Sequence, residues 1–125
     1  MAESGQSHPD PQLRLRACTR RHGPTMIIEV DGEIDHATAD LLREHVITAA
    51  LAISPPHVVL DFDQVTFCDS SGLGALIAIW KAVRAHHGDL VVARPPGVCR
   101  RILERTGLDR HITIHPTLEG ALRHA

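Results

Sequence analysis

The side chains best suited to chemistry gather in one segment, residues 69–74, which reads Asp-Ser-Ser-Gly-Leu-Gly. An apolar run at residues 58–60 precedes it, and apolar residues at helical spacing follow it. Asp69 and Ser70 suit the start of a helix, where their oxygens can accept hydrogen bonds from unpaired N–H groups. Gly72 and Gly74 lack side chains, so another surface can approach the backbone there. On residue chemistry alone, a helix cap is the simpler interpretation.

Other kinds of site fit the chain less well. The Gly-x-Gly spacing is not followed by Lys-Ser/Thr, and Lys81 lies too far along the helix to serve a nucleotide loop. A nucleophilic serine would need a nearby base and an oxyanion site, and no Gly-x-Ser-x-Gly elbow is present. The histidines at 86, 87, 111 and 115 lack a carboxylate or cysteine at metal-binding spacing. We therefore predict no catalytic residues, no metal and no cofactor.

Composition narrows the classes of partner. The 125 residues suit one domain with one core, which must be aliphatic because 43% of residues are hydrophobic and only 2% aromatic. Few side chains can stack on bases or sugars. The net charge of −2 provides no basic stripe for nucleic acid or an anionic membrane. We expect neither of these to be a direct partner.

The cysteines and the chain start bear on the compartment. Cys18, Cys68 and Cys99 are odd in number and have no CxxC spacing, which argues against a disulfide framework or structural zinc. Cys68 is expected to be a small buried filler. No apolar run approaches the roughly 20 residues that span a bilayer. Residues 1–11 are polar, without an apolar signal core, and we expect a disordered tail on a cytoplasmic protein.

Strands and helices must alternate to position residues 69–74. The pattern predicts strands at residues 13–18, 26–30, 58–60, 90–93 and 112–114, with a loop at residues 62–70. It predicts helices at residues 42–53, from 70 to about 85, from 97 to 106 and from 117 to 122, with Val98, Ile102 and Leu103 of the third facing the core. A turn at residues 22–24 makes the first two strands an antiparallel hairpin. This order predicts one α/β domain over residues 12–125, with a mixed, mostly parallel five-stranded sheet, an antiparallel first strand and about four helices.

Three separated segments resemble the STAS domain, specifically that of bacterial anti-sigma factor antagonists. The first is residues 69–74 after an apolar strand. The second is residues 31–39, where Gly-Glu-Ile-Asp precedes the first helix, and the third is residues 103–109, followed by residues 112–122. The resemblance covers roughly residues 13–123, and three motifs in the right order make it specific.

The resemblance implies a cycle of partner exchange. The unphosphorylated antagonist binds an anti-sigma factor and releases a sigma factor for transcription. The anti-sigma factor is usually a serine kinase with a histidine-kinase-like ATP fold, which phosphorylates Ser71 and abolishes binding. A serine phosphatase restores it. Ser70 is the alternative phosphosite, and the implied partner-binding residues are Gly32, Glu33, Asp35, His36, Asp69, Ser70, Ser71, Gly72, Leu73 and Gly74.

The sequence leaves more than one role open for Asp35 and Asp69. Asp35 can contact the partner, cap the first helix, or do both. Asp69 is expected to cap the second helix and can also position the Ser71 hydroxyl. Two other functions remain as alternatives: a STAS scaffold or small-ligand sensor without serine phosphorylation, and an enzyme with Ser71 as nucleophile.

Overall fold

The computed structural model describes residues 14–124, so the predicted tail at residues 1–11 lies outside the described residues. Strands and helices alternate after an initial hairpin, as predicted. The elements are β1 (Leu15–His22), β2 (Thr25–Ile34), α2 (Ala39–Ala50), β3 (His57–Cys68), α3 (Ser70–Ala85), β4 (Asp89–Ala93), α4 (Gly97–Thr106), a 3-10 turn (Leu108–Arg110), β5 (Thr113–His115) and α5 (Leu118–His124).

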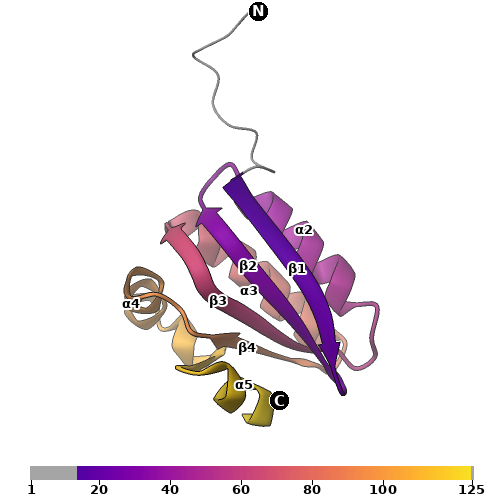
Figure 1. Cartoon of the computed structure of the whole chain (residues 1–125). Helices are drawn as coiled ribbons and strands as arrows, with labels where there is room; N and C mark the ends of the chain where they lie inside the picture. Colours follow the sequence, from indigo (N-terminus) through magenta and orange to yellow (C-terminus); the bar gives the residue numbers. More distant parts are fainter. Residues whose placement is uncertain (1–13, 125) are drawn as a thin grey trace, which may run out of the picture.

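The five strands form one sheet in the order β1-β2-β3-β4-β5 (Figure 1). Strand β1 runs antiparallel to β2, and every other neighbouring pair is parallel. This confirms the predicted mixed sheet with an antiparallel first strand. A parallel pair requires a crossover connection, and here helices provide it.

A two-residue loop sets the register of the hairpin. His22 pairs with Thr25 across Gly23 and Pro24, and Gly23 adopts a φ of 60°, a value that glycine reaches without strain. The same register places Leu15 opposite Gly32 at the far end of the hairpin. Arg14, the residue before Leu15, therefore lies beside the Gly-Glu-Ile-Asp segment at residues 32–35.

Strand β3 is much longer than predicted. It runs through Cys68, so the loop predicted at residues 62–70 is wrong over most of its length. The extra residues pair with the second half of β2, where the register shifts between Glu29 and Asp31 and again between Gly32 and Glu33. These irregularities break the strict alternation of buried and exposed residues that marks a strand in a sequence.

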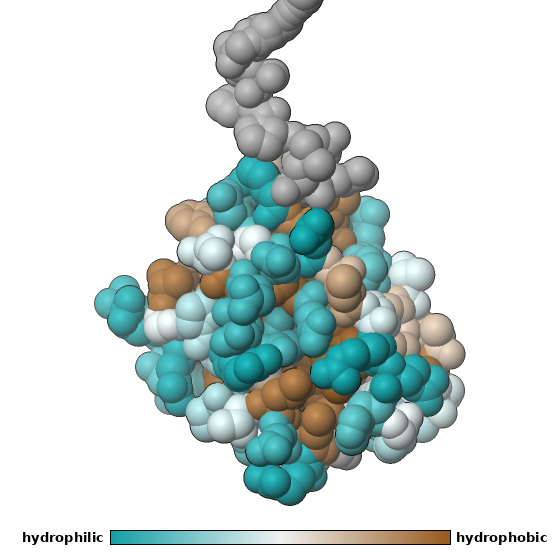
Figure 2. Space-filling model, viewed as in Figure 1, coloured by the Kyte–Doolittle hydropathy of each residue, from teal (hydrophilic) through white to brown (hydrophobic). Residues whose placement is uncertain are grey.

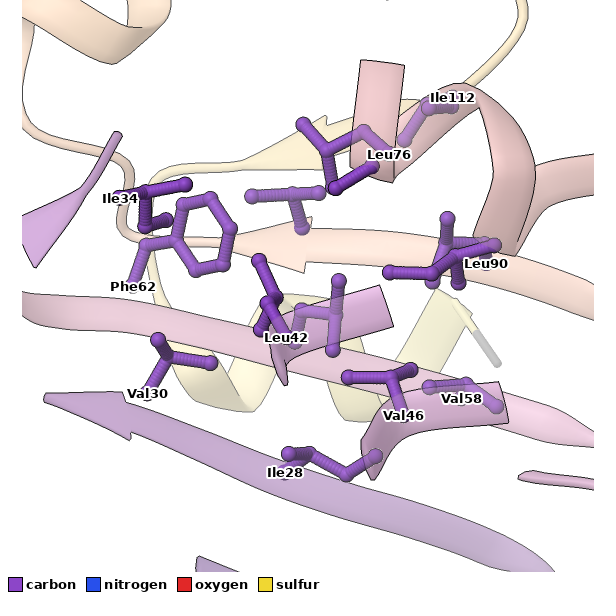
Figure 3. Packing of buried hydrophobic residues seen from close by; sticks show 14 of the residues in the cluster. Ile28, Val30, Ile34, Leu42, Val46, Val58, Phe62, Leu76, Leu90 and Ile112 are labelled. Atoms are coloured by element: carbon purple, nitrogen blue, oxygen red, sulfur yellow. The ribbon is translucent and has the colours of Figure 1, made fainter. Parts of the chain in front are cut away.

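Helices α2, α3 and α4 cover one face of the sheet, and α5 covers part of the other. The larger core lies beneath the first three, where Phe62 and Ile34 pack near Leu42 and Leu76 (Figure 3). The smaller core joins α5 to β3 and β4 and consists of Val59, Val91, Ala93 and Ala121, with Leu118 and Leu122 packed against it. Both cores are almost wholly aliphatic, as the composition predicts.

The third predicted helix is present, but its buried face is shifted. Helix α4 follows Pro96 and ends at Gly107, whose φ of 74° is the left-handed conformation of a helix C-cap. Cys99 and Leu103 are its buried residues, whereas Val98 is exposed and Ile102 only partly buried. The prediction of Val98 as a core residue is therefore wrong, because Cys99 fills that place.

The sheet face seen in Figure 1 carries many hydrophilic side chains over β1 and β2 (Figure 2). Arg16, Arg20, Glu29 and Asp31 are exposed there. Charged side chains along an edge strand such as β1 discourage pairing with another chain. None of the helices within residues 14–124 combines the length and apolar character needed to cross a bilayer.

Candidate functional site

The segments at residues 31–36 and 69–74 meet at the carboxyl ends of β2 and β3. Ile34 pairs with Cys68 in the sheet, and the Asp69 N–H donates a hydrogen bond of 3.1 Å to the Ile34 carbonyl. Both segments therefore lie at the end of the sheet that the arrowheads of these two strands mark (Figure 1). Two motifs that are far apart in the sequence form a single corner.

Asp69 caps helix α3, as predicted. Its carboxylate accepts a 2.8 Å hydrogen bond from the Ser71 N–H, and its carbonyl accepts one of 3.0 Å from the Gly72 N–H. Ser70 is exposed at the first helical position, and Ser71 is half-buried at the second. The cap fixes the backbone of both serines and leaves their hydroxyls beside a helix N-terminus, whose partial positive charge favours anions.

The two glycines of this segment have opposite surroundings. A Cβ on Gly72 would lie 2.9 Å from the Cys68 Sγ and 2.9 Å from the Ile34 Cγ2, so core side chains make the close approach there. A Cβ on Gly74 would meet nothing within 4 Å. Gly72 lets α3 pack tightly on the strand ends, whereas Gly74 leaves the outer face of α3 open.

Asp35 organises the turn before α2 without being its N-cap. Thr38 is the N-cap residue of α2, so of the two roles that the sequence left open for Asp35, partner contact and helix N-cap, the N-cap position belongs to another residue. The Asp35 carboxylate still accepts hydrogen bonds from the N–H groups of Ala37 (2.9 Å) and Thr38 (3.1 Å). In return, the Thr38 hydroxyl accepts one of 2.9 Å from the Asp35 N–H and donates one of 2.7 Å to the Glu33 carbonyl.

An arginine that sequence reasoning missed holds this turn to β1. Arg14 donates hydrogen bonds to Glu33 (Nη1 to Oε1, 2.8 Å) and to both Asp35 carboxylate oxygens (2.5 Å to Oδ2 and 3.3 Å to Oδ1). These bonds from Arg14, against some desolvation, hold the pKa of Asp35 below its ordinary value of 3.8. The hairpin register is the signal that could have found it, because Leu15 pairs with Gly32, and one further step in the same register would set Arg14 opposite Glu33.

Ser71 borders a shallow hollow between α2 and α3. The hollow has a volume of about 360 Å³, and its charged or titratable lining residues are His36, Asp40 and Arg43. Arg43 Nη2 lies 3.4 Å from the Asp40 Oδ1, and both side chains are exposed. Among residues 14–124, no hydrogen bond links the Ser71 hydroxyl to His36.

Phe67 adds an apolar group that sequence reasoning also missed. This residue is 46% exposed, next to the end of β3, and it pairs with Glu33 in the sheet. The predicted partner-binding residues around it have differing accessibility: Ser70, His36 and Gly74 are exposed, Asp69, Ser71, Leu73, Gly32, Glu33 and Asp35 are partly buried, and Gly72 is buried. An exposed aromatic beside a polar rim is typical of a protein-binding surface.

The buried cysteines and His111 contact other side chains of the protein. Cys68 and Cys99 are buried free cysteines, and the thiol of Cys68, together with burial, raises the pKa of Cys99. The His111 ring lies 5.3 Å from that of Trp80. Within residues 14–124, no group of three or more His, Cys, Asp or Glu side chains is arranged to hold a metal ion.

Comparison with known proteins identifies the family. The STAS domain family matches residues 17–121. The chain belongs to the STAS domain family. It is 35% identical over 101 residues to the anti-sigma-F factor antagonist RsfB of Mycobacterium tuberculosis, covering 81% of each chain.

Solved structures of anti-sigma factor antagonists share the fold. An anti-sigma factor antagonist from Mycobacterium paratuberculosis superimposes with a TM-score of 0.79 at 33% identity, covering 94% of this chain and 97% of that one. SpoIIAA of Bacillus, an anti-sigma factor antagonist, has been solved unphosphorylated and phosphorylated, with TM-scores of 0.71 and 0.66. It is 23% identical, covering 87% of this chain and 95% and 98% of those chains, so its likeness concerns the fold.

Proposed function

We propose that this STAS protein is an anti-sigma factor antagonist. Its unphosphorylated form binds an anti-sigma factor and so releases a sigma factor, and phosphorylation of Ser71 abolishes that binding. The anti-sigma factor is itself a serine kinase with a histidine-kinase-like ATP fold, and a serine phosphatase reverses the reaction. The chain acts as substrate and binding protein, with no catalytic group of its own.

The accessible position of Ser71 in the corner carries this proposal. It sits beside a helix N-terminus, on the corner that residues 31–36 also form, so one modification lies within the surface that a partner would cover. Phe67 supplies an exposed apolar group near this corner, and Gly74 leaves the outer face of α3 open to close approach. Ser70 is the alternative phosphosite, more exposed but outside the lining of the hollow.

The chemistry of the modification is a phosphoryl transfer. The Ser71 Oγ forms a bond to the γ-phosphorus of ATP, the bond between that phosphorus and the β–γ bridging oxygen breaks, ADP leaves, and the hydroxyl proton passes to a base of the kinase or to water. The product carries about −1.5 to −2 charges at neutral pH. A helix N-terminus favours such an anion by up to about 1 kcal/mol, so the fold persists.

The phosphate therefore acts on binding and leaves folding unchanged. It adds bulk and negative charge beside Asp69, within a surface that has to pack against another protein. A loss of about 4 kcal/mol of binding free energy weakens affinity about a thousandfold, which is enough for a switch.

The test compares four forms of the full chain: wild type, Ser71→Ala, Ser71→Asp and, as a matched control, Ser70→Ala. Partners are captured from a lysate of the source bacterium with and without ATP, the captured kinase-like anti-sigma factor is purified, and its affinity for each form is measured. Phosphate is mapped by mass spectrometry. We expect Ser71→Ala to bind and escape phosphorylation, Ser71→Asp to bind at least a hundredfold more weakly, and Ser70→Ala to behave as wild type.

Four results would contradict the proposal. Equal affinity of Ser71→Ala and Ser71→Asp would remove the switch, and phosphate on Ser70 alone would move the site. A stable partner complex with no phosphate on either serine would favour a scaffold or ligand-sensing STAS module. Hydrolysis of an activated ester that is lost in Ser71→Ala would instead indicate a nucleophilic serine.

A further inference from the structure

We propose that Arg43 of helix α2 is the internal receptor for the phosphate on Ser71. This inference rests on the proposed phosphorylation and concerns what the phosphoryl group contacts once it is attached. In the unmodified protein Arg43 pairs with Asp40, and in the phosphorylated protein its guanidinium turns to the phosphate. The modification then ties α3 to α2 across the hollow between them.

The lining of the hollow provides the geometry. Ser71 and Gly74 border it from α3, while Asp40 and Arg43 border it from α2, with His36 from the turn before that helix. A phosphate on the Ser71 Oγ lies at the border of this space, beside the open position left by Gly74. Arg43 is the arginine of this lining, and a guanidinium matches phosphate oxygens with two parallel N–H donors.

The present partner of Arg43 holds it weakly. The Arg43–Asp40 contact is 3.4 Å between residues three apart on an exposed helix surface, and the Asp40 side chain is 76% exposed. Exposed pairs of this kind contribute little, because solvent screens them and both side chains lose freedom. A phosphate with up to two charges and three acceptor oxygens is the stronger partner.

Other charges around Ser71 act in both directions. Asp40 lines the hollow, and Asp69 lies against the Ser71 N–H, so both carboxylates oppose an added anion. His36 adds positive charge when it is protonated. The N–H groups at the start of α3 and the Arg43 guanidinium favour the anion. Removing Arg43 should therefore make the phosphate dianion measurably harder to form.

The experiment uses the full chain with phosphoserine incorporated at position 71 during recombinant expression, so no kinase is needed. The second ionisation of the phosphoserine is followed by phosphorus-31 NMR between pH 4 and 8. We expect the phosphoserine pKa to rise by about 0.2 to 0.7 unit in Arg43→Gln, because a neighbouring cation favours the dianion. Arg43→Lys should recover at least part of that shift, and Asp40→Asn should lower the pKa.

Arg100→Gln is the matched control. Arg100 is an exposed helical arginine with a 3.7 Å contact to Glu104 four residues along α4, outside the lining of the hollow. It should leave the phosphoserine pKa unchanged. Because imidazoles ionise in the same pH range as phosphoserine, the comparison is repeated in a His36→Gln background. Equal pKa values in Arg43→Gln and Arg100→Gln would overturn the assignment of Arg43.

This outcome is separate from that of the proposed function. A pKa shift specific to Arg43, with unchanged partner affinity on phosphorylation, would retain the receptor and reject the switch. Partner release on phosphorylation, with no effect of Arg43 on the phosphoserine pKa, would retain the switch and reject the receptor.

Discussion

At the scale of single residues, Gly72 and Gly74 share one helical turn but serve different purposes. Gly72 allows α3 to sit against Cys68 and Ile34, at a distance where a methyl group would have to displace a core side chain. Gly74 faces open space. The sequence shows two equivalent glycines, and only the packing tells which one supports the corner and which one leaves its surface accessible.

The first prediction compares alanine at these two positions. Gly72→Ala should lower the free energy of unfolding by about 1–3 kcal/mol, because the added methyl overpacks the contact with Cys68 and Ile34. Gly74→Ala, the matched control, should raise it by about 0.5–1 kcal/mol, because alanine is the better helix former and meets nothing. Urea unfolding measures both. Equal effects would show that the corner is not tightly packed.

Two residues of the corner could not be named from the sequence, for different reasons. Arg14 reads as one of several arginines in an alternating strand, and its role depends on where the hairpin register places it. Phe67 reads as a core residue by its type, but it lies on the exposed side of a bulged strand. The cap formed by Asp69 was predictable, because it depends only on neighbours in the chain.

At the scale of elements, local patterns predicted those elements whose periodicity is regular. Helix α3 and strand β4 were predictable, because apolar residues recur in α3 at helical spacing and form a continuous buried run in β4. Strand β3 was cut short in the prediction, since polar residues follow Phe62 and the next buried positions, Val65 and Cys68, are each three residues on. That spacing is not a strand period, and only the irregular pairing with β2 accommodates it.

An ion pair joins Asp61, within β3, to Arg94, the residue that follows β4. The Asp61 side chain is only 4% exposed, and Arg94 donates to it from Nη2 (2.6 Å) and Nε (3.1 Å). Arg94 adopts a φ of 54°, which is uncommon for a residue with a side chain, and its N–H donates to the His115 carbonyl. The ion pair therefore stabilises an unusual turn after β4.

The second prediction is that the two halves of this pair are not equivalent. Arg94→Gln should cost about 2–4 kcal/mol of stability, because it removes the counterion and leaves a carboxylate buried. Asp61→Asn should cost about 1 kcal/mol, because the half-exposed guanidinium can be hydrated instead. Chemical denaturation of both variants measures the two losses of stability. A larger loss in Asp61→Asn than in Arg94→Gln would mean that the Asp61 carboxylate reaches solvent readily.

At the scale of the whole molecule, the candidate site occupies one end of the sheet, and the core lies beneath it. The strand order and the helix connections place residues 31–36 and residues 69–74 side by side. The α/β pattern of the sequence predicted this strand and helix order in outline. The hollow between α2 and α3 was beyond prediction, because it depends on how two helices cross and on which side chains each one turns toward the other. Fold class follows from periodicity, whereas a site follows from packing.

The third prediction concerns stability as a function of pH. Because Arg14 lowers the pKa of Asp35, the folded state keeps this charge at pH values where the unfolded chain has begun to bind a proton. The stabilisation is therefore complete above about pH 5 and is lost as the pH falls below 3.8, the ordinary value, through the lower folded pKa. Arg14→Gln should be less stable than wild type at pH 7, and the difference should shrink in acid.

Arg20→Gln is the control for that titration. Arg20 lies on β1, the strand that begins directly after Arg14, and contacts Glu29 at 3.5 Å, with both side chains 49% exposed. Thermal unfolding between pH 7 and pH 2.5 should show little change in the gap between Arg20→Gln and wild type. A constant gap for Arg14→Gln as well would mean that Arg14 stabilises the corner through packing rather than charge.

The close packing around Gly72 has a consequence for the rate at which the protein responds to phosphorylation. Asp69 caps the start of α3, and Gly72 packs it closely against Cys68 and Ile34. The backbone there is therefore held in place and does not move when a group is added at the surface. Under the proposed function, the signal therefore crosses no distance within the protein and waits for no slow rearrangement. The rate of the response is limited by phosphoryl transfer and by partner dissociation. A cell would therefore control that rate through the amounts of kinase and phosphatase.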